Sequence, residues 1–139
     1  MTKGAEPKSR LGADTEKITI NLGFVDLGQV DLLVAEGFYS NRTDFIRTAI
    51  RNQIAQHSDV VKRSVTRHQF DLGLRRYSRR DLEAARAAGD VLHIQVLGLA
   101  TIDDDVTPDL ALETIASIRV LGALHASAAV KAALADRIG

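Results

Sequence analysis

The sequence predicts an α+β protein in two parts, a strand followed by two helices and then a small module of repeated β-α units. Three observations lead to this prediction. Residues 17–22 alternate strictly between polar and apolar side chains, two amphipathic helical patterns follow up to about residue 56, and an apolar segment at 94–98 recurs at 118–122. Period two indicates a strand and period 3.6 a helix, whereas a recurring unit indicates stacked repeats.

The composition is that of a globular protein without cysteine. Of the 139 residues, 45% are hydrophobic and 26% are charged, which is typical of a folded chain. The lack of cysteine excludes disulfides, thiolate catalysis and cysteine-based zinc sites. No apolar run approaches the roughly 18 residues of a membrane helix, and residues 1–17 lack the apolar stretch of a signal peptide. We therefore expect a cytoplasmic protein.

The net charge of zero conceals two halves of opposite charge. Residues 1–80 carry 14 Lys and Arg against 9 Asp and Glu, and residues 81–139 carry 4 against 9. A basic half is typical of a chain that meets a polyanion. Two solvated surfaces of unequal charge are the alternative interpretation.

The first element is expected at 17–22, after an arm at 1–16 whose glycines, proline and scattered charges predict flexibility. Ile18, Ile20 and Leu22 share one face of this strand. Its backbone groups need a partner, and no partner strand lies nearby in sequence. We expect the same strand of a second copy to supply it, in a two-stranded antiparallel ribbon; an edge strand of an ordinary domain is the alternative.

Two helices are predicted next. The first runs from about Val25 to Glu36 and ends at Gly37, a typical C-terminal residue. The second begins at the N-cap Asn41, with Asp44 placed as in a capping box, and runs to about residue 56. The apolar stripes expected to be buried are Leu27, Val30, Leu33 and Val34 in the first helix and Phe45, Ile46, Ala49, Ile50 and Ile54 in the second.

Residues 17–57 resemble the ribbon-helix-helix superfamily of the MetJ, Arc and CopG repressors. The most specific part of the resemblance is the motif GFYSNRTDFIR at 37–47, and one departure is Gly23, where many relatives have proline. The resemblance implies a DNA-binding transcriptional regulator, most simply a repressor. It would act as a homodimer whose ribbon enters the major groove of a pseudo-palindromic operator in double-stranded DNA.

The resemblance also implies site residues. The base readers would be the polar row of the strand, Lys17, Thr19 and Asn21. Lysine can donate to guanine, asparagine can pair with adenine, and the threonine methyl can meet thymine. A backbone phosphate would be bound at the start of the second helix, by Asn41, Arg42 and Thr43, through the first amides and the helix dipole.

A basic stretch follows at 58–80, with a net charge of +5. Its first part, 58–68, is expected to be either a basic linker or an extension of the second helix. Candidates for additional phosphate contacts in its second part are Arg75, Arg76, Arg79 and Arg80. An ordinary solvated stretch is the alternative.

A repeat of 24 residues organises the C-terminal part. Alignment of 91–111 with 115–135 gives seven identities, and each copy reads as a strand followed by a helix, with caps at Thr107 and Ser127. A weaker copy is expected at 70–88. Units of this length predict parallel strands or a short solenoid.

Three roles are open for this module, residues 69–139. As an oligomerisation or effector domain, it would bring dimers together into tetramers or higher assemblies. As the C-terminal part of an antitoxin, it would bind a toxin partner, although such tails are typically disordered until bound. As a self-assembling scaffold, it would be tethered by DNA binding to the chromosome or a plasmid, in keeping with a nucleoid-associated location. We rank the three roles in this order.

No catalytic residue, cofactor or metal site is expected, and no enzyme activity. The four histidines, His57, His68, His93 and His125, lack ligand spacing, which disfavours the metal sensing of nickel-responsive relatives. The run Asp103-Asp104-Asp105 is expected to be a solvated turn and not a cation site.

Overall fold

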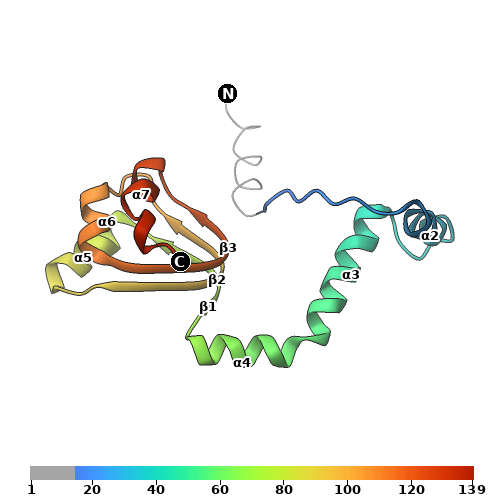
Figure 1. The fold of residues 1–139 in the computed structure, drawn as a ribbon, viewed down its shortest axis with the longest axis horizontal. Helices are drawn as coiled ribbons and strands as arrows, with labels where there is room; N and C mark the ends of the chain where they lie inside the picture. Colours follow the sequence, from blue (N-terminus) through green and yellow to red (C-terminus); the bar gives the residue numbers. More distant parts are fainter. Residues whose placement is uncertain (1–14) are drawn as a thin grey trace. The chain divides into compact units, whose positions relative to one another are not determined.

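The computed structural model describes residues 15–139, so the arm expected at 1–16 lies almost wholly outside the described residues. The chain divides into two compact units, the first ending at Arg63 and the second comprising Ser64–Gly139. Each unit is described by itself (Figure 1). The helices before the sheet are α2 (Phe24–Ala35), α3 (Arg42–Gln56) and α4 (Ser58–His68), the last of which spans the boundary between the units.

Helix α2 ends in a Schellman motif at the predicted glycine. Gly37 has a φ of +87°, which glycine adopts without the penalty that other residues meet. Its N–H donates to the carbonyl of Val34, and the N–H of Phe38 donates to the carbonyl of Leu33, both at 3.0 Å. These bonds satisfy two of the last carbonyls of the helix.

Helix α3 begins at the predicted N-cap. The side chain of Asn41 accepts a hydrogen bond from the N–H of Asp44 at 2.8 Å, and the Asp44 carboxylate accepts one from the N–H of Ser40 at 2.9 Å. The pair is a capping box whose returning bond reaches one residue further back than usual. Helix α3 ends before His57, and α4 follows as a separate helix. The stretch 58–68 is thus helical without continuing α3.

The strand expected at 17–22 is not formed in the single chain. Residues 15–23 have no regular secondary structure. A lone strand has no partner for its backbone groups, and the one sheet among the described residues is parallel and built from later strands. The expected β-α-α order is therefore present only as its two helices. Gly23 adopts a φ of −64°, which is the value that proline imposes, so its difference from proline leaves the turn geometry unchanged.

The second unit consists of three successive strand-helix pairs, as the repeat predicted. They are β1 (Asp71–Tyr77) with α5 (Arg79–Ala88), β2 (Leu92–Ile102) with α6 (Pro108–Thr114), and β3 (Ile115–His125) with α7 (Ala128–Ala133) and the short 3-10 helix η1 (Ala135–Arg137). The strands are parallel in the order β1-β2-β3. Ile94 lies beside Ile118 and Gly98 beside Gly122, so the sequence repeat is also the register of the sheet.

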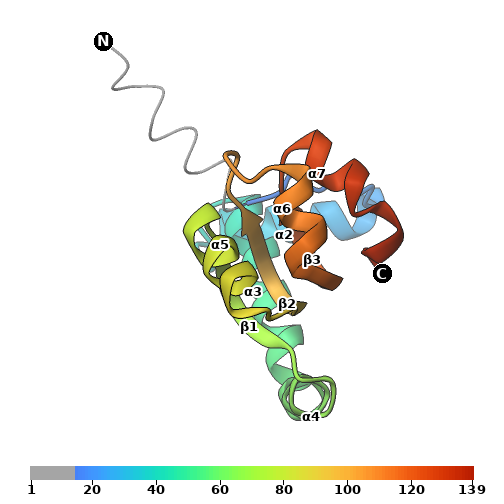
Figure 2. The same ribbon diagram turned by 90° about the vertical axis from the view of Figure 1, so that its left-hand side faces the viewer.

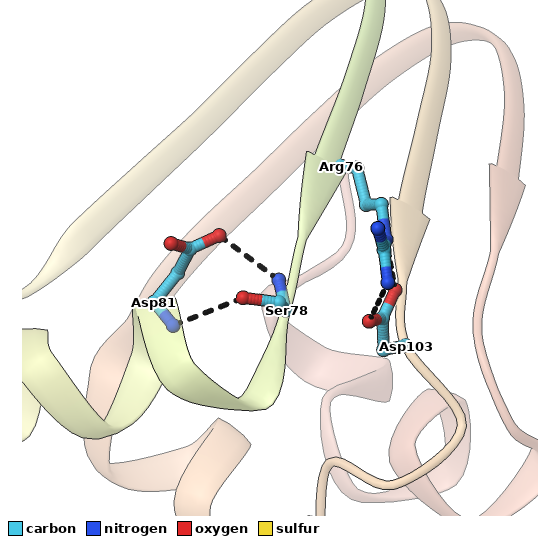
Figure 3. A network of polar contacts seen from close by, with 4 residues as sticks. All are labelled: Arg76, Ser78, Asp81 and Asp103. Carbon is cyan, nitrogen blue, oxygen red and sulfur yellow. Dashed lines mark hydrogen bonds and ion pairs between the residues drawn. The ribbon is translucent and has the colours of Figure 1, made fainter.

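The helices of this unit are capped by hydroxyl side chains. The side chains of Ser78, Thr107 and Ser127 each accept a hydrogen bond from the amide three residues later, at 3.1–3.2 Å. At Ser78 the bond is reciprocated, since the Asp81 carboxylate accepts from the Ser78 amide at 3.1 Å (Figure 3). Both caps predicted for the aligned repeats are confirmed.

Strands β2 and β3 run away from the helices, bend and return toward them (Figure 1). The middle of the strands holds a row of glycines with positive φ, +124° at Gly73, +140° at Gly98 and +122° at Gly122. A Cβ atom on Gly98 or Gly122 would clash with the carbonyl oxygen of the preceding glycine in the row. Glycine is therefore required there both for the bend and for the close approach of the strands.

The core of the second unit lies between the bent sheet and helices α5–α7 (Figure 2). Alternate residues of β2 are buried, namely Ile94, Val96, Ala100 and Ile102. Helices α5 and α7 contribute the fully buried Leu82 and Val130, and Leu134 at the C-cap of α7 is fully buried as well. The unit is a short solenoid in which each coil contains one bent strand and one helix.

Candidate nucleic-acid interface

The predicted base readers are accessible in the single chain. Lys17, Thr19 and Asn21 are all exposed. The apolar residues that alternate with them are exposed as well, with 79% of Ile18, 60% of Ile20 and 42% of Leu22 accessible. Both rows of the segment are therefore open, although only the polar row has a composition suited to water.

An apolar groove of about 460 Å³ lies beside this segment. Its lining consists of Ile20 and Leu22 from the segment, Asp26, Gln29, Val30 and Leu33 from α2, and Phe45, Ile46, Ala49 and Ile50 from α3. Among the described residues of the first unit, Val30 is the one hydrophobic side chain that is buried. A folded domain rarely leaves such a surface without a function.

The stripe of α3 that was expected to be buried is not buried in the single chain. No residue of α3 is buried, and Ile50 and Ile54 are 51% and 59% exposed. One neighbouring helix and an unpaired segment cover only part of the stripe. The stripe was predicted to be buried in a dimeric helical core, and the single chain leaves it uncovered.

The start of α3, where a phosphate contact was predicted, leaves its first backbone amides without partners in the helix. The first backbone amide that donates within the helix is that of Phe45, to the carbonyl of Asn41 at 3.2 Å. The amides of Arg42 and Thr43 precede it and point out of the helix end, as the first amides of any helix do. The positive end of the helix dipole adds to their attraction for a phosphate.

The guanidinium of Arg42, however, is engaged within the chain. It donates two hydrogen bonds to the carboxylate of Asp31 in α2, at 2.8 and 2.9 Å. This bonding lowers the pKa of Asp31 from its ordinary value and raises that of Arg42. Both side chains remain about half exposed, so the pair lies at the surface beside the start of α3.

Most of the arginines proposed for additional phosphate contacts also have acidic partners. Arg75 lies 3.4 Å from Asp71, and Arg79 lies 3.6 Å from Glu83. Arg76 donates two hydrogen bonds to Asp103, at 2.8 and 2.6 Å (Figure 3). Arg80 is exposed. Three of the four arginines in the second part of the stretch are thus paired with carboxylates of the second unit.

The histidines and the aspartate run occupy ordinary positions. His93 Nδ1 lies 2.8 Å from the hydroxyl of Ser117, and the ring of His68 contacts that of Phe70. Both carboxylate oxygens of Asp103 accept from Arg76. Within residues 15–139, no group of three His, Asp or Glu side chains is arranged to hold a metal ion. No helix in that range is long and apolar enough to cross a membrane.

Two features were missed at the level of sequence. One is the partner of Arg42, because Asp31 lies 11 residues away and nothing in its neighbourhood indicates the pairing. The other is the glycine row. The spacing of Gly73, Gly98 and Gly122 repeats with the unit, and this was a readable signal for a bend at one level of the coil.

An alternating segment followed by two capped helices with an open apolar face is the arrangement of a strand-and-helix DNA-binding domain. Comparison with protein-family models agrees, since residues 13–131 match the Ribbon-Helix-Helix transcriptional regulator family. The match covers more than half of the chain and extends into the last repeat, so the chain belongs to this family, as the resemblance of 17–57 indicated. Comparisons with curated proteins and with solved structures found no match.

Proposed function

We propose that the protein is a homodimeric regulator that reads the major groove with an antiparallel ribbon formed by two copies of residues 17–22. The observation that carries this proposal is the open apolar groove between that segment and helices α2 and α3. A partner segment supplies what the single chain lacks, hydrogen-bond partners for the backbone of 17–22 and apolar cover for the groove.

The exposed side chains give the dimer a strong driving force. Ile18, Ile20, Ile50 and Ile54 are each more than half exposed. Full burial of one such side chain stabilises an assembly by roughly 1.5–3 kcal/mol. Since these side chains are already partly covered, several of them in each of two copies contribute a stabilisation of the same order as the entropy lost on association, about 4–15 kcal/mol.

Pairing in the ribbon turns the apolar row toward the helices and the polar row toward DNA, because neighbouring residues of a strand face opposite sides. Lys17, Thr19 and Asn21 then meet base edges in the major groove. The Asn41-capped start of α3 binds a phosphate. We assign this contact to the amides of Arg42 and Thr43 first, since Asp31 already holds the Arg42 guanidinium.

Occupation of a promoter by the dimer is the simplest route to repression, and its two-fold symmetry calls for an operator with a dyad. The second part of the basic stretch adds less than its composition suggests, since Arg75, Arg76 and Arg79, three of its four arginines, have acidic partners. We do not propose toxin binding, because the second unit has its own buried core, whereas tails that fold on a partner lack one.

The dimer proposal is tested with Ile20→Lys, which puts a charge into the groove. Val60→Lys is the matched control, since Val60 is 51% exposed on α4 and lies outside the groove lining. Binding to duplex DNA and the shape of the binding isotherm are measured by fluorescence anisotropy over a range of protein concentrations. We expect Ile20→Lys to lose DNA binding and the control to keep it. Wild-type affinity in Ile20→Lys would overturn the ribbon dimer.

A further inference from the structure

The two ends of the solenoid present unpaired strand edges. In the second unit, the described residues pair β1 on one side only, with β2. The outer edge of β3 is paired at one point, where Ile138 bridges Ile118 and the N–H of Gly139 donates to the Ile118 carbonyl at 2.8 Å. Unpaired edges of this kind are templates for another strand.

The glycine row continues to the open edge of β1. Gly98 and Gly122 have positive φ, and each packs against the carbonyl of the glycine before it, where a Cβ atom would clash. Gly73 has the same unusual φ of +124°, yet a Cβ built there would meet no atom within 4 Å. At Gly73, β1 thus has the same unusual backbone conformation as β2 and β3 have at Gly98 and Gly122. Among the residues that the structure describes, no neighbouring strand contacts Gly73 at the outer edge of β1.

The two open edges also match in register, and their lengths differ by one residue. Asp71 pairs with Val96, and Val96 pairs with Val120, so β1 corresponds to the part of β3 that starts at Val120. Residues 138–139 occupy the edge of β3 only beside Ile118. Strand β1 of another copy therefore fits the remaining stretch, from Val120 to His125, without overlapping these residues.

Apolar side chains complete the match. Leu72, Leu97 and Leu121 form one row across the outer face of the sheet, and Leu72 and Leu121 at its two ends are 70% and 49% exposed. A parallel row contains Leu74, Leu99 and Ala123, and Leu74 is also 70% exposed. Strands in a sheet lie about 4.8 Å apart, so a strand added in register would bring Leu121 of one copy against Leu72 of the next.

We propose that second units of different copies stack head to tail, with β1 of one copy adding in parallel to the Val120–His125 edge of β3 of another, Gly73 beside Gly122. The parallel sheet then continues from one chain into the next. The contact uses a different surface on each partner, so it is heterologous and does not close on itself as a two-fold dimer does. Combined with ribbon dimers, it links regulators bound at neighbouring DNA sites.

The test uses full-length protein in sedimentation velocity. Leu72→Glu with Leu74→Glu charges the β1 edge, and Leu121→Glu with Ala123→Glu charges the β3 edge. We expect wild type to form species larger than a dimer that grow with concentration, and each double variant to be reduced to one small species. Val91→Glu is the control, since Val91 is 58% exposed and lies outside both edges; it should assemble as wild type does.

Mixing the two double variants restores association, because the intact β3 edge of the first fits the intact β1 edge of the second. This result also shows that both variants are folded. The proposal is overturned if wild type remains one small species at every concentration, or if the charged edges leave its assembly unchanged. Failure of the ribbon proposal would look different, since DNA binding would be absent while the large species still formed.

Discussion

Arg42 and Asp31 form a two-pronged ion pair that joins the first residue of α3 to the middle of α2, with nitrogen–oxygen distances of 2.8 and 2.9 Å. The pair fixes the start of α3 against α2 at the place where we propose that a phosphate binds. It also places a carboxylate close to that phosphate. The same contact therefore supports the fold of the first unit and opposes the approach of DNA.

Asp31→Asn separates these two effects. We expect slightly lower thermal stability and tighter non-specific DNA binding, because the carboxylate is gone and Arg42 is released. If Arg42 then contacts a phosphate, the slope of log affinity against log salt steepens by about 0.9. Glu36→Gln removes the same charge from the exposed end of α2 and should leave the slope near that of wild type. Equal effects of the two substitutions would argue against the proposed position of the phosphate.

Asn41→Ala tests the cap of α3. The lost hydrogen bond to the Asp44 amide should cost about 1 kcal/mol of stability. The affinity for DNA should fall by the same factor whatever the DNA sequence, since a phosphate contact carries no base information. Asn52→Ala, at an exposed position in the same helix, should be neutral or slightly stabilising. Chemical denaturation and DNA titration give both quantities. A sequence-dependent loss in Asn41→Ala would contradict its assignment as a phosphate contact.

Gly98→Ala tests the glycine row. Alanine is strained at a φ of +140°, and its Cβ would clash with the Gly73 carbonyl. We therefore expect the free energy of unfolding to fall by about 3 kcal/mol or more. Gly89→Ala is the matched control. Gly89 also has a positive φ, but a Cβ there meets no atom within 4 Å, so the loss should be about 1–2 kcal/mol. Denaturation measurements that rank the two substitutions in the opposite order would refute the close approach of β1 and β2.

The ion pair of Arg76 with Asp103 should make the second unit sensitive to acid. Hydrogen bonds from Arg76 lower the pKa of Asp103 below its ordinary value of 3.8. The carboxylate of the unfolded chain therefore binds its proton at higher pH than that of the folded chain. The stabilisation is complete above the unfolded value and is lost as the pH falls through the lowered folded value. Asp103→Asn should reduce the melting temperature at neutral pH and converge with wild type in acid. A constant difference down to low pH would show that the pairing is not its cause.

Local patterns were sufficient to predict most of the helices and the repeat. The caps at Asn41 and Ser127 each depend on a side chain and the backbone amide three residues later. The Schellman turn depends on one glycine, Gly37. The 24-residue repeat also fixed the register of β2 against β3, because equivalent residues pair when identical units stack.

Features that depend on distant or absent groups could not be predicted in this way. The pairing of Arg42 with Asp31 depends on how two helices pack. The exposure of Ile50 and Ile54 reflects a stripe whose cover is missing from a single chain. Segment 17–22 differs from these features, because the lack of a nearby partner strand in the sequence already indicated that a lone copy could not hydrogen-bond it.

Selection of bound duplexes from random DNA shows whether the polar row of 17–22 reads DNA sequence. Wild type and Asn21→Ala are used, with Asn52→Ala as the control, since Asn52 is exposed on α3 and lies outside the groove lining. We expect wild type and control to enrich the same dyad-symmetric site. Asn21→Ala should lose preference at one base position in each half-site, worth about 1–3 kcal/mol. An unchanged site in Asn21→Ala, or no enriched site for wild type, would contradict the claim.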